Sequence, residues 1–556
     1  MSTTMRIFVA FACLCCAVRS LDNGLGLTPA MGYNSWYDYG CSLNEKGIRA
    51  TADALVDYGF SKLGYIYVNL DDCWAKGRYD NGTVYSDPNT FPSGMKALAD
   101  YIHSKGLKFG VYTDRGTKTC GGRPGTQDHE EIDAKTYAEW GVDYLKEDSC
   151  NAPGDHGSAF EQYAKMRDAL NATGRPILYS LCGWNRWYAP IGYSLANSWR
   201  IGPDDTNWGG VLKNIDINAE LAPYAGPGGW NDPCLLLGNT STNSPRVTEI
   251  QQRSQFSMWS VMASPLLISS NVRNLSLYAL ETYSNAEVIA VNQDPLGKQG
   301  MRLYGGSLSQ NPNLPPAHLS KCNSSNKAHK WIWNTPKTGF VKNVASGKCL
   351  NVDNCGSDII YYECVSTGGT CCGKDCYKNE SWLFYLNGQM LSDLNHKCVT
   401  AHSDGTISLE TCIGDNTPSQ TWAYDQNSQQ LTHNGMCLDG SEMVNSNGTN
   451  VWGRELADGS WAFVFLNIGP NPVDISCDIS CFEAAGFDLS VKLTVRDLWT
   501  HTVNGTTTGG GYTAKSVPGN GGSVMVKFTR VATTGSPSFL EAHGLCRSDK
   551  SRPWRR

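Results

Sequence analysis

The sequence predicts an α/β protein: a (β/α)8 barrel, then a Cys-rich region with internal repeats, and then an antiparallel β-sandwich. Three observations lead to this prediction. Eight apolar strand segments alternate with helical segments up to about residue 292, the composition changes after Tyr304, and short alternating strands follow Val451. Eight strand–helix units in succession indicate parallel strands that close into a barrel. A doubly wound open sheet would also alternate, but it usually has fewer strands, and no G-x-G-x-x-G follows the first strand.

The bulk composition fits a globular protein of two or three domains. The chain has 556 residues, of which 40% are hydrophobic and 18% are charged. Its net charge is −6, whereas phosphate binding requires a basic surface, so nucleic acid is not expected as a partner.

Residues 1–20 are predicted to be a signal peptide, because Arg6 precedes an apolar run from Ile7 to Val18 that is too short to span a bilayer. No later segment is apolar enough to cross a membrane, so no membrane partner is expected. Eight N-x-S/T sequons and 22 cysteines, three of them within the first 20 residues, fit an oxidising secretory route. The protein is therefore expected to be secreted or to enter a lysosome- or vacuole-like compartment.

The barrel is expected within residues 21–303. Its strands are predicted in the segments Ala30–Trp36, Tyr65–Trp74, Leu107–Asp114, Asp143–Cys150, Pro176–Gly183, Ser198–Asp205, Gly228–Leu236 and Ser264–Ser270. Helices are expected between them, for example over 45–60, 92–106, 130–141 and 159–174, where apolar residues recur at helical spacing or Pro and Gly mark the ends.

Polar side chains gather where these apolar strands end, and the carboxyl ends of barrel strands are where function concentrates. They are Trp36, Asp71, Asp72, Tyr112, Lys146, Asp148, Trp184, Arg200 and Asp204. Strand alternation puts Lys146, Asp148 and Cys150 on one face, where a cation would keep the aspartate ionised, as a nucleophile requires. A lone Lys-x-Asp is more often a solvated pair. The Asp71–Asp72 pair could hold a metal or form a solvated turn, but no H-E-x-x-H or similar ligand spacing accompanies it, so neither a metal nor a cofactor is expected.

Residues 304–446 contain ten cysteines between Cys322 and Cys437, after a Pro/Asn/Ser-rich linker. The segments GKCLNV, HKCVTA and GMCLDG recur, preceded in turn by Trp333, Trp382 and Trp422, and SQTWAY contains a Q-x-W. These repeats resemble the ricin-type β-trefoil. The resemblance implies a β-trefoil-like insertion between barrel and sandwich with a second carbohydrate ligand. Alternatively, its cysteines only staple a small insert. The C-terminal sandwich is expected over 447–535 and a frayed basic tail over 536–556.

Nine ordered motifs identify a family: LDNGLGLTPAMGYNSW, NLDDCW, GVYTD, KTCGG, YLKEDSC, SLCGW, WR-x-x-x-D, GPGGWNDP and NQDPLGKQG. They resemble glycoside hydrolase family 27, which includes α-galactosidases and α-N-acetylgalactosaminidases. The resemblance covers 21–303 and 451–530. It implies retaining hydrolysis of a terminal α-galactoside, with Asp148 as nucleophile and Asp204 as general acid/base. Asp204 must then hold a proton at working pH, which requires a raised pKa.

The resemblance also implies the remaining roles. Asp71 and Asp72 would accept from the 4- and 6-hydroxyls of the sugar, Trp36 would lie against its apolar face, and Tyr112 would line the pocket. Lys146 and Arg200 would bind ring hydroxyls. Disulfides are implied for Cys41 with Cys73, Cys120 with Cys150, and Cys477 with Cys481.

Specificity at the sugar 2-position is implied by the strand that ends in SLCGW. Cys182 and Trp184 would fill the space of an N-acetyl group, which favours galactose; the retained Asp71 argues against a β-L-arabinopyranosidase. Departures from the family pattern are Gly183, where an acidic residue is usual, Cys234 in place of an aspartate, and Glu147 in place of an aromatic. An α-N-acetylgalactosaminidase and an inactive galactose-binding lectin stay open as alternatives, and a homodimer is compatible with the sequence.

Overall fold

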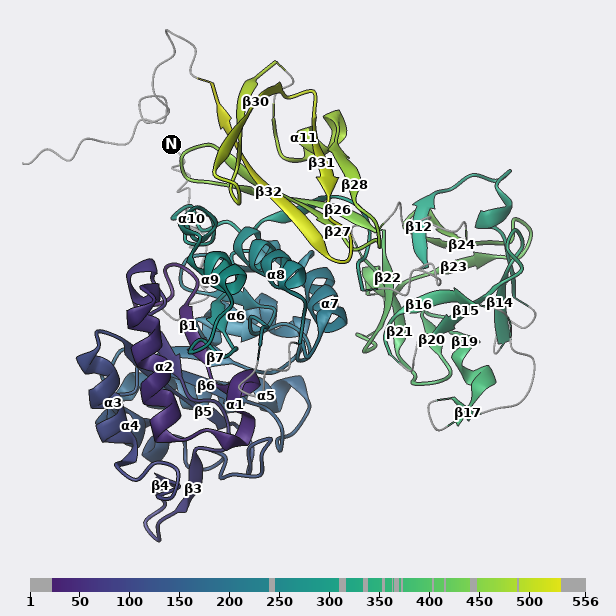
Figure 1. Cartoon of the computed structure of the whole chain (residues 1–556). Helices are drawn as coiled ribbons and strands as arrows, with labels where there is room; N and C mark the ends of the chain where they lie inside the picture. Colours follow the sequence, from purple (N-terminus) through teal and green to yellow (C-terminus); the bar gives the residue numbers. More distant parts are fainter. Residues whose placement is uncertain are drawn as a thin grey trace, which may run out of the picture. The chain divides into compact units, whose positions relative to one another are not determined.

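The computed structural model describes residues 23–531, apart from 240–245, 310–316, 334–338, 353–355, 363, 365–369, 372–373, 403–404, 415–416, 441–447 and 488–489. The predicted signal peptide and basic tail lie outside the described residues. The chain divides into two compact units, one formed by Met1–Leu308 with Thr449–Arg556, and the other by Ser309–Gly448 (Figure 1).

Eight parallel strands form the central sheet of the first unit, in the order β10-β1-β2-β5-β6-β7-β8-β9. They are β1 (Met31–Asn34), β2 (Tyr67–Asn69), β5 (Lys108–Asp114), β6 (Tyr144–Asp148), β7 (Leu178–Leu181), β8 (Ser198–Arg200), β9 (Trp230–Asp232) and β10 (Leu266–Ile268). Leu236, just after β9, forms a parallel bridge with Ile268 of β10, so the two ends of the sheet meet. The predicted (β/α)8 barrel is confirmed.

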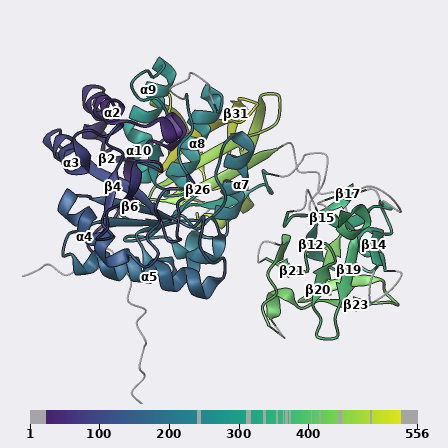
Figure 2. The same cartoon turned by 90° about the horizontal axis from the view of Figure 1, so that it is seen from below.

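Helices surround these strands (Figure 2). They are α1 (Trp36–Tyr39), α2 (Glu45–Asp57), α3 (Gly94–Ser104), α4 (Glu130–Trp140), α5 (His156–Ala172), α6 (Ala189–Leu195), α7 (Trp208–Asn218), α8 (Glu249–Val261), α9 (Leu277–Ser284) and α10 (Ala286–Asn292). Helix α2 starts where the Asn44 side chain accepts from the Gly47 N–H, and it buries Ile48 and Leu55. Helix α5 begins earlier than expected because the Asp155 side chain accepts from the Ser158 N–H and caps it. A hairpin of β3 (Ala75–Arg78) and β4 (Val84–Ser86) follows β2.

The C-terminal sandwich belongs to the same unit as the barrel. Its larger sheet has the order β11-β26-β27-β32-β29-β30, and β28 pairs with β31. The elements are β11 (Met301–Tyr304), β26 (Thr449–Glu455), β27 (Trp461–Asn467), β28 (Val473–Cys477), α11 (Ile479–Ala484), β29 (Lys492–Asp497), β30 (Thr502–Thr508), β31 (Tyr512–Val517) and β32 (Gly522–Arg530). Phe463, Phe482 and Phe528 pack edge to face or tilted in its core. Tyr304, where the repeat region was expected to begin, ends the sandwich strand β11, which pairs with β26.

The second unit consists of short antiparallel strands. They are β12 (His318–Lys321), β13 (Trp331–Trp333), β14 (Gly339–Asn343), β15 (Cys349–Val352), β16 (Ile359–Tyr362), β17 (Thr370–Cys371), β18 (Lys374–Asp375), β19 (Ser381–Phe384), β20 (Met390–Ser392), β21 (Cys398–Ala401), β22 (Ile407–Glu410), β23 (Ala423–Asp425), β24 (Gln430–His433) and β25 (Met436–Asp439). The first strand, β12, pairs with the last, β25, and the disulfide Cys322–Cys437 joins the same two ends. Two further disulfides, Cys349–Cys364 and Cys398–Cys412, each close one repeat.

Three buried tryptophans make the same contact in each repeat of this unit. In every case the indole Nε1 donates to the backbone carbonyl of the residue that follows a repeat cysteine. The pairs are Trp331–Leu438 at 2.9 Å, Trp382–Leu350 at 2.9 Å and Trp422–Val399 at 2.8 Å. The expectation that Trp333 is the first of the three is wrong. Trp331 makes the repeated contact, while Trp333 packs against Phe384 and Tyr424. Both tryptophans of the W-I-W strand are buried, because alternate residues of a strand point to the same side. The threefold pattern is that of a β-trefoil.

None of the helices in the described part of the chain is long and apolar enough to cross a membrane.

Candidate active site

The predicted site residues come from neighbouring strand ends of the barrel. By element they are Trp36 (first residue of α1, after β1), Asp71 and Asp72 (after β2), Tyr112 (β5), Lys146 and Asp148 (β6), Cys182 and Trp184 (after β7), Arg200 (end of β8) and Asp204 (beyond β8). Since β1, β2, β5, β6, β7 and β8 are successive in the sheet, their carboxyl ends place these side chains around one mouth.

Asp148 is buried at the end of β6. One of its oxygens, Oδ2, accepts from the Tyr112 hydroxyl at 3.0 Å, and Oδ1 accepts from the Ser149 N–H at 2.9 Å. Burial raises the pKa of Asp148 to about 7; Lys146 opposes this, but the carboxylates of Asp114, Asp71 and Asp204 add to it. The expectation that Lys146 holds the pKa of Asp148 low is therefore wrong, because burial and three like charges outweigh one cation.

Lys146 forms its ion pair with Asp71 instead. The distance from Nζ to Asp71 Oδ2 is 2.8 Å, and the same oxygen accepts from Asn34 Nδ2 at 2.8 Å. The Lys146 ammonium also lies 5.1 Å from the centroid of the Tyr112 ring. Asp71 and Lys146 are 75 residues apart in the sequence, so the partner of this lysine could not be read from the local K-x-D motif.

Asp204 is paired with Arg200, four residues earlier. The guanidinium Nη2 donates to Asp204 Oδ1 at 3.0 Å and to the Gly202 carbonyl at 3.1 Å. Burial raises the pKa of Asp204, but the charges of Arg200 and Lys146 outweigh it, and the pKa is lowered overall. The expectation of a raised pKa at Asp204 is wrong, because Arg200 stabilises the charged form.

The two carboxylates share electrostatic partners. Asp148 and Asp204 both act on the pKa values of Lys146 and of the Cys182 thiol, and Asp204 raises the pKa of Asp148. Sites coupled in this way titrate as a pair, in which a proton on one carboxyl favours ionisation of the other.

Asp72 is held by backbone donors. Its Oδ1 accepts from the Cys73 N–H and its Oδ2 from the Gly121 N–H, each at 2.6 Å. Burial raises its pKa. Asp71 Oδ1 accepts from the Asp72 N–H at 2.9 Å, so the dipeptide is fixed by its own backbone.

The loop after β7 has an unusual backbone. Trp184 is half-buried and adopts a left-handed conformation, with φ of 55°. A Cβ atom at Gly183 would overlap the Tyr188 ring, so Tyr188 occupies the space of the acidic side chain that is usual at this position in the family. Cys182 is a buried free thiol, and its Sγ lies 3.7 Å from Arg200 Nη1.

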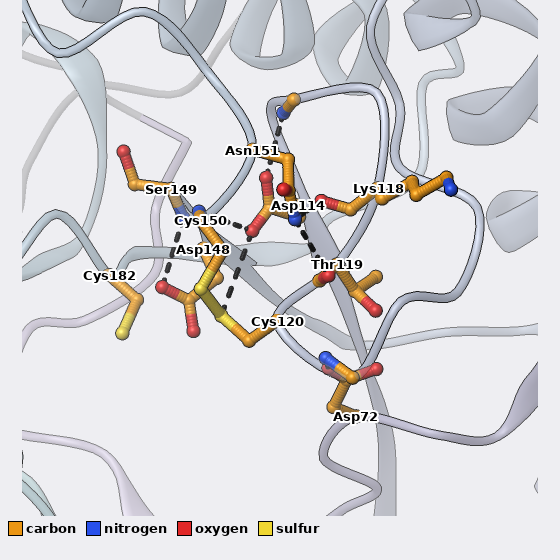
Figure 3. The surroundings of a disulfide bond; sticks show 12 residues. Asp72, Asp114, Lys118, Thr119, Cys120, Asp148, Ser149, Cys150, Asn151 and Cys182 are labelled. Atoms are coloured by element: carbon orange, nitrogen blue, oxygen red, sulfur yellow. Dashed lines mark hydrogen bonds between the residues drawn. A yellow bond between two sulfur atoms is a disulfide. The ribbon is translucent and has the colours of Figure 1, made fainter.

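Three predicted cysteine pairs are joined in the structure: Cys41–Cys73, Cys120–Cys150 and Cys477–Cys481. Figure 3 shows the second of these beside Asp148 and Asp114. Asp114 accepts from the Gly116 N–H at 2.8 Å and from the Cys150 N–H at 2.7 Å, so it fixes the turn that carries this disulfide. Asp114 closes the GVYTD motif but was not among the predicted site residues.

A second network lies beside Arg200, of which the sequence indicated only Cys234, as a departure from the family pattern. Cys234 is a buried free thiol whose Sγ lies 3.7 Å from the Tyr37 hydroxyl, and it contacts Asp205. Asp205 Oδ2 accepts from Gln255 Nε2 at 3.0 Å, and burial raises its pKa well above the usual range. Burial also raises the pKa of the Cys234 thiol well above its usual range, so Arg200 has an uncharged neighbour here.

Three family models match the chain. The models of α-galactosidase A, the ricin-type β-trefoil lectin domain and the α-galactosidase C-terminal β-sandwich domain match residues 28–294, 337–460 and 446–528. An α-galactosidase of Oryza sativa subsp. japonica is 48% identical over 310 residues, covering 53% of this chain and 72% of the relative. An α-galactosidase of Cyamopsis tetragonoloba is 49% identical over 304 residues, with 52% and 72% covered. The crystal structure of α-galactosidase I from Mortierella vinacea is similar with a TM-score of 0.62 and 25% identity, over 92% of this chain and 99% of that chain.

Proposed function

The chain belongs to glycoside hydrolase family 27, and we propose on this basis that it is a retaining α-galactosidase. It removes terminal α-D-galactosyl residues from oligosaccharides, galactomannans or glycoconjugates. The observation that carries the proposal is the pair of carboxylates, Asp148 at the end of β6 and Asp204 beyond β8, which share Lys146 and Cys182 as electrostatic partners.

Hydrolysis proceeds in two displacements. The Asp148 carboxylate attacks C1 as the glycosidic C1–O bond breaks, and Asp204 gives its proton to the leaving oxygen. A water molecule then attacks C1, Asp204 takes the proton of that water, and the ester bond to Asp148 breaks. The second displacement thus returns the proton to Asp204 and the bonding electron pair to the Asp148 carboxylate.

The surroundings of the two carboxyls favour the proton on Asp148 rather than on Asp204. With an Asp148 pKa of about 7 and a lowered pKa at Asp204, the pair below neutral pH carries its proton on Asp148. Substrate binding must therefore transfer this proton to Asp204. A sugar hydroxyl that takes over a hydrogen bond of Arg200 weakens its hold on Asp204, and the positive charge that develops at C1 favours ionised Asp148.

The remaining residues bind the hexose. Asp71 and Asp72 accept from the 4- and 6-hydroxyls in a fixed geometry, which selects axial O4. Trp36 lies against the apolar face, Tyr112 lines the pocket, and Lys146 and Arg200 donate to ring hydroxyls. Cys182 and Trp184 fill the 2-position, which favours galactose over its N-acetylated analogue.

The second unit binds a carbohydrate of its own, as the match to the lectin-domain model suggests. Of the predicted boundaries 21–303, 304–446 and 447–535, we move those of the repeat region to 309–448, because Tyr304 ends strand β11 of the sandwich. A signal peptide precedes these parts and a basic tail follows them. Secretion, or delivery to a lysosome- or vacuole-like compartment, fits the disulfides of both units.

The test uses the full secreted chain and three aryl glycosides: α-galactoside, α-N-acetylgalactosaminide and β-L-arabinopyranoside. The proposal requires that the α-galactoside is hydrolysed fastest, with α-galactose as the first product by proton NMR. β-Galactose as first product would refute retention. Galactose binding without hydrolysis of any of the three would favour the inactive lectin.

A further inference from the structure

Glu147 is a buried carboxyl group that the proposed mechanism does not use. It precedes Asp148 in β6 and points to the opposite side of the strand, where its exposed fraction is 0%. This orientation agrees with the alternation expected from the sequence. The residue therefore lies behind the site rather than in it.

If Glu147 is charged, the two hydroxyl groups that contact it have fewer protons to donate than there are acceptor oxygens around them. The Thr126 hydroxyl lies 2.8 Å from Glu147 Oε1 and 2.9 Å from the Asp114 carbonyl oxygen, yet it has one proton to give. The Tyr179 hydroxyl is likewise shared between Glu147 Oε2 and the Tyr163 carbonyl. A proton on Glu147 Oε1 removes the shortage at Thr126, because the carboxyl then donates to Oγ1 while Thr126 donates to Asp114.

The groups packed around Glu147 do not favour its charge. They are Asp114 on β5, Glu130 and Tyr137 on α4, Tyr163 on α5 and Tyr179 on β7. In the described part of the chain, no lysine, arginine or histidine ion-pairs with it. Burial raises the pKa of Glu147 to about 8, and Asp114 and Glu130 add to this against the hydrogen bonds of Tyr179 and Thr126.

We propose that Glu147 is kept as the uncharged acid, donates its proton to Thr126, and is thereby a positioning residue for the nucleophile-bearing end of β6. The contact chain runs from Glu147 through Thr126 to the carbonyl of Asp114, and Asp114 in turn holds the Cys150 N–H at 2.7 Å. Tyr179 ties the same carboxyl to β7. Three adjacent strands are thus fastened directly behind Asp148. The nucleophile role of Asp148 rests on the proposed function, but the protonation state of Glu147 does not.

Protonation is tested without enzyme activity. The difference infrared spectrum of wild type minus Glu147→Gln at pH 7 should contain the C=O stretch of one buried protonated carboxyl. In thermal unfolding, Glu147→Gln should match wild type at pH 4 and become progressively more stable than wild type towards pH 8. The reason is that an unfolded glutamate ionises near pH 4.3 while the folded one stays neutral, so wild-type stability falls with rising pH across this window. Glu131→Gln, at an exposed position on the same side of the barrel, is the matched control and should show no pH-dependent gap.

Positioning is tested by kinetics on an aryl α-galactoside. Glu147→Gln supplies an N–H to Thr126 and should keep kcat within about twofold, whereas Glu147→Ala should lower kcat on the order of tenfold with little change in KM. Thr126→Val should reproduce the loss in kcat. Absence of the infrared band, or parallel unfolding curves, would overturn the neutral acid; equal kcat in wild type, Glu147→Ala and Thr126→Val would overturn the positioning role. If wild type itself fails to turn over, the proposed function fails, while the infrared and unfolding results still decide the charge state.

Discussion

Arg200 holds Asp204 through a hydrogen bond of 3.0 Å between Nη2 and Oδ1. The residue with the acid/base role in our proposal is therefore stabilised in its charged form, while Asp148 is buried with a pKa of about 7. The two carboxyls start from charge states opposite to those that the first displacement needs. Activity in the acidic range follows from this arrangement, because the pair must hold one proton.

Removing the charge of Arg200 should move the alkaline limb of the pH profile. Arg200→Gln takes away the cation that lowers the pKa of Asp204, so the pH at which kcat, which reports the substrate-bound enzyme with its proton on Asp204, falls on the alkaline side should rise by about one unit. Arg200→Lys keeps the charge and serves as the control, with a limb near that of wild type although binding is weaker. An unmoved limb in Arg200→Gln would show that Arg200 does not set this pKa.

Asp148→Asn should abolish turnover. The amide cannot form the glycosyl ester, so kcat on an aryl α-galactoside should fall by at least about a thousandfold, while galactose binding stays measurable by calorimetry. Asp168→Asn, on the exposed face of α5, should leave kcat unchanged. Substantial turnover by Asp148→Asn would remove Asp148 from the nucleophile role.

Trp184→Ala should open the 2-position. The half-buried indole would no longer fill the space of an acetamide, so the rate on the α-N-acetylgalactosaminide relative to the α-galactoside should increase, by about tenfold for a contact of this size. Since Trp184 has a left-handed backbone, Trp184→Gly tests the same change without strain. If the ratio stays constant in both variants, another group controls this position.

Glu287 should stabilise the first unit against acid. It lies on α10 and forms bonds of 2.6 and 2.8 Å with Arg496 of β29, and Arg496 together with His501 lowers its pKa to about 2, against the effect of burial. A lowered folded pKa gives stability that is complete above the unfolded value of about 4.3 and is lost as the pH falls towards 2. Glu287→Gln should therefore cost about 1 kcal/mol near pH 6, as partly exposed pairs do, and nothing near pH 2. Unfolding curves at both pH values, with Glu131→Gln as control, measure this; a cost that persists at pH 2 would contradict it.

Removal of the second unit should separate binding from catalysis. Deleting 309–448 and joining Leu308 to Thr449 with a short Gly-Ser linker preserves β11, which a cut at Tyr304 would damage. The Asn450 side chain donates to the Gly306 carbonyl at 3.0 Å, so the two ends lie close together. Turnover of an aryl α-galactoside should be unchanged and retention on galactomannan weakened. If the full chain and the deletion variant bind galactomannan equally well, the second unit has only a structural role.

The sequence predicted the barrel well because its strands are apolar runs at regular intervals, and polar residues at their ends had to meet at one mouth. Charge states were not predictable in the same way. The K-x-D motif suggested that Lys146 serves Asp148, but its ion-pair partner in three dimensions is Asp71, in the segment that follows β2. The pKa of Asp204 depends on burial and on Arg200 together, and their balance has no local sequence signal. Composition also could not show that the Tyr188 ring takes the space at Gly183, since only the folded loop brings these two together.

The repeat unit begins and ends on strands that are bonded to each other, β12 and β25, and covalently joined through Cys322 and Cys437. A domain closed in this way needs only two neighbouring points of attachment in the protein into which it is inserted. Such a domain can be gained, lost or exchanged for another sugar-recognition domain during evolution without changing the core packing of the first unit. Chimeric enzymes that vary only this domain would share one catalytic chemistry and differ in the polysaccharides to which they are delivered.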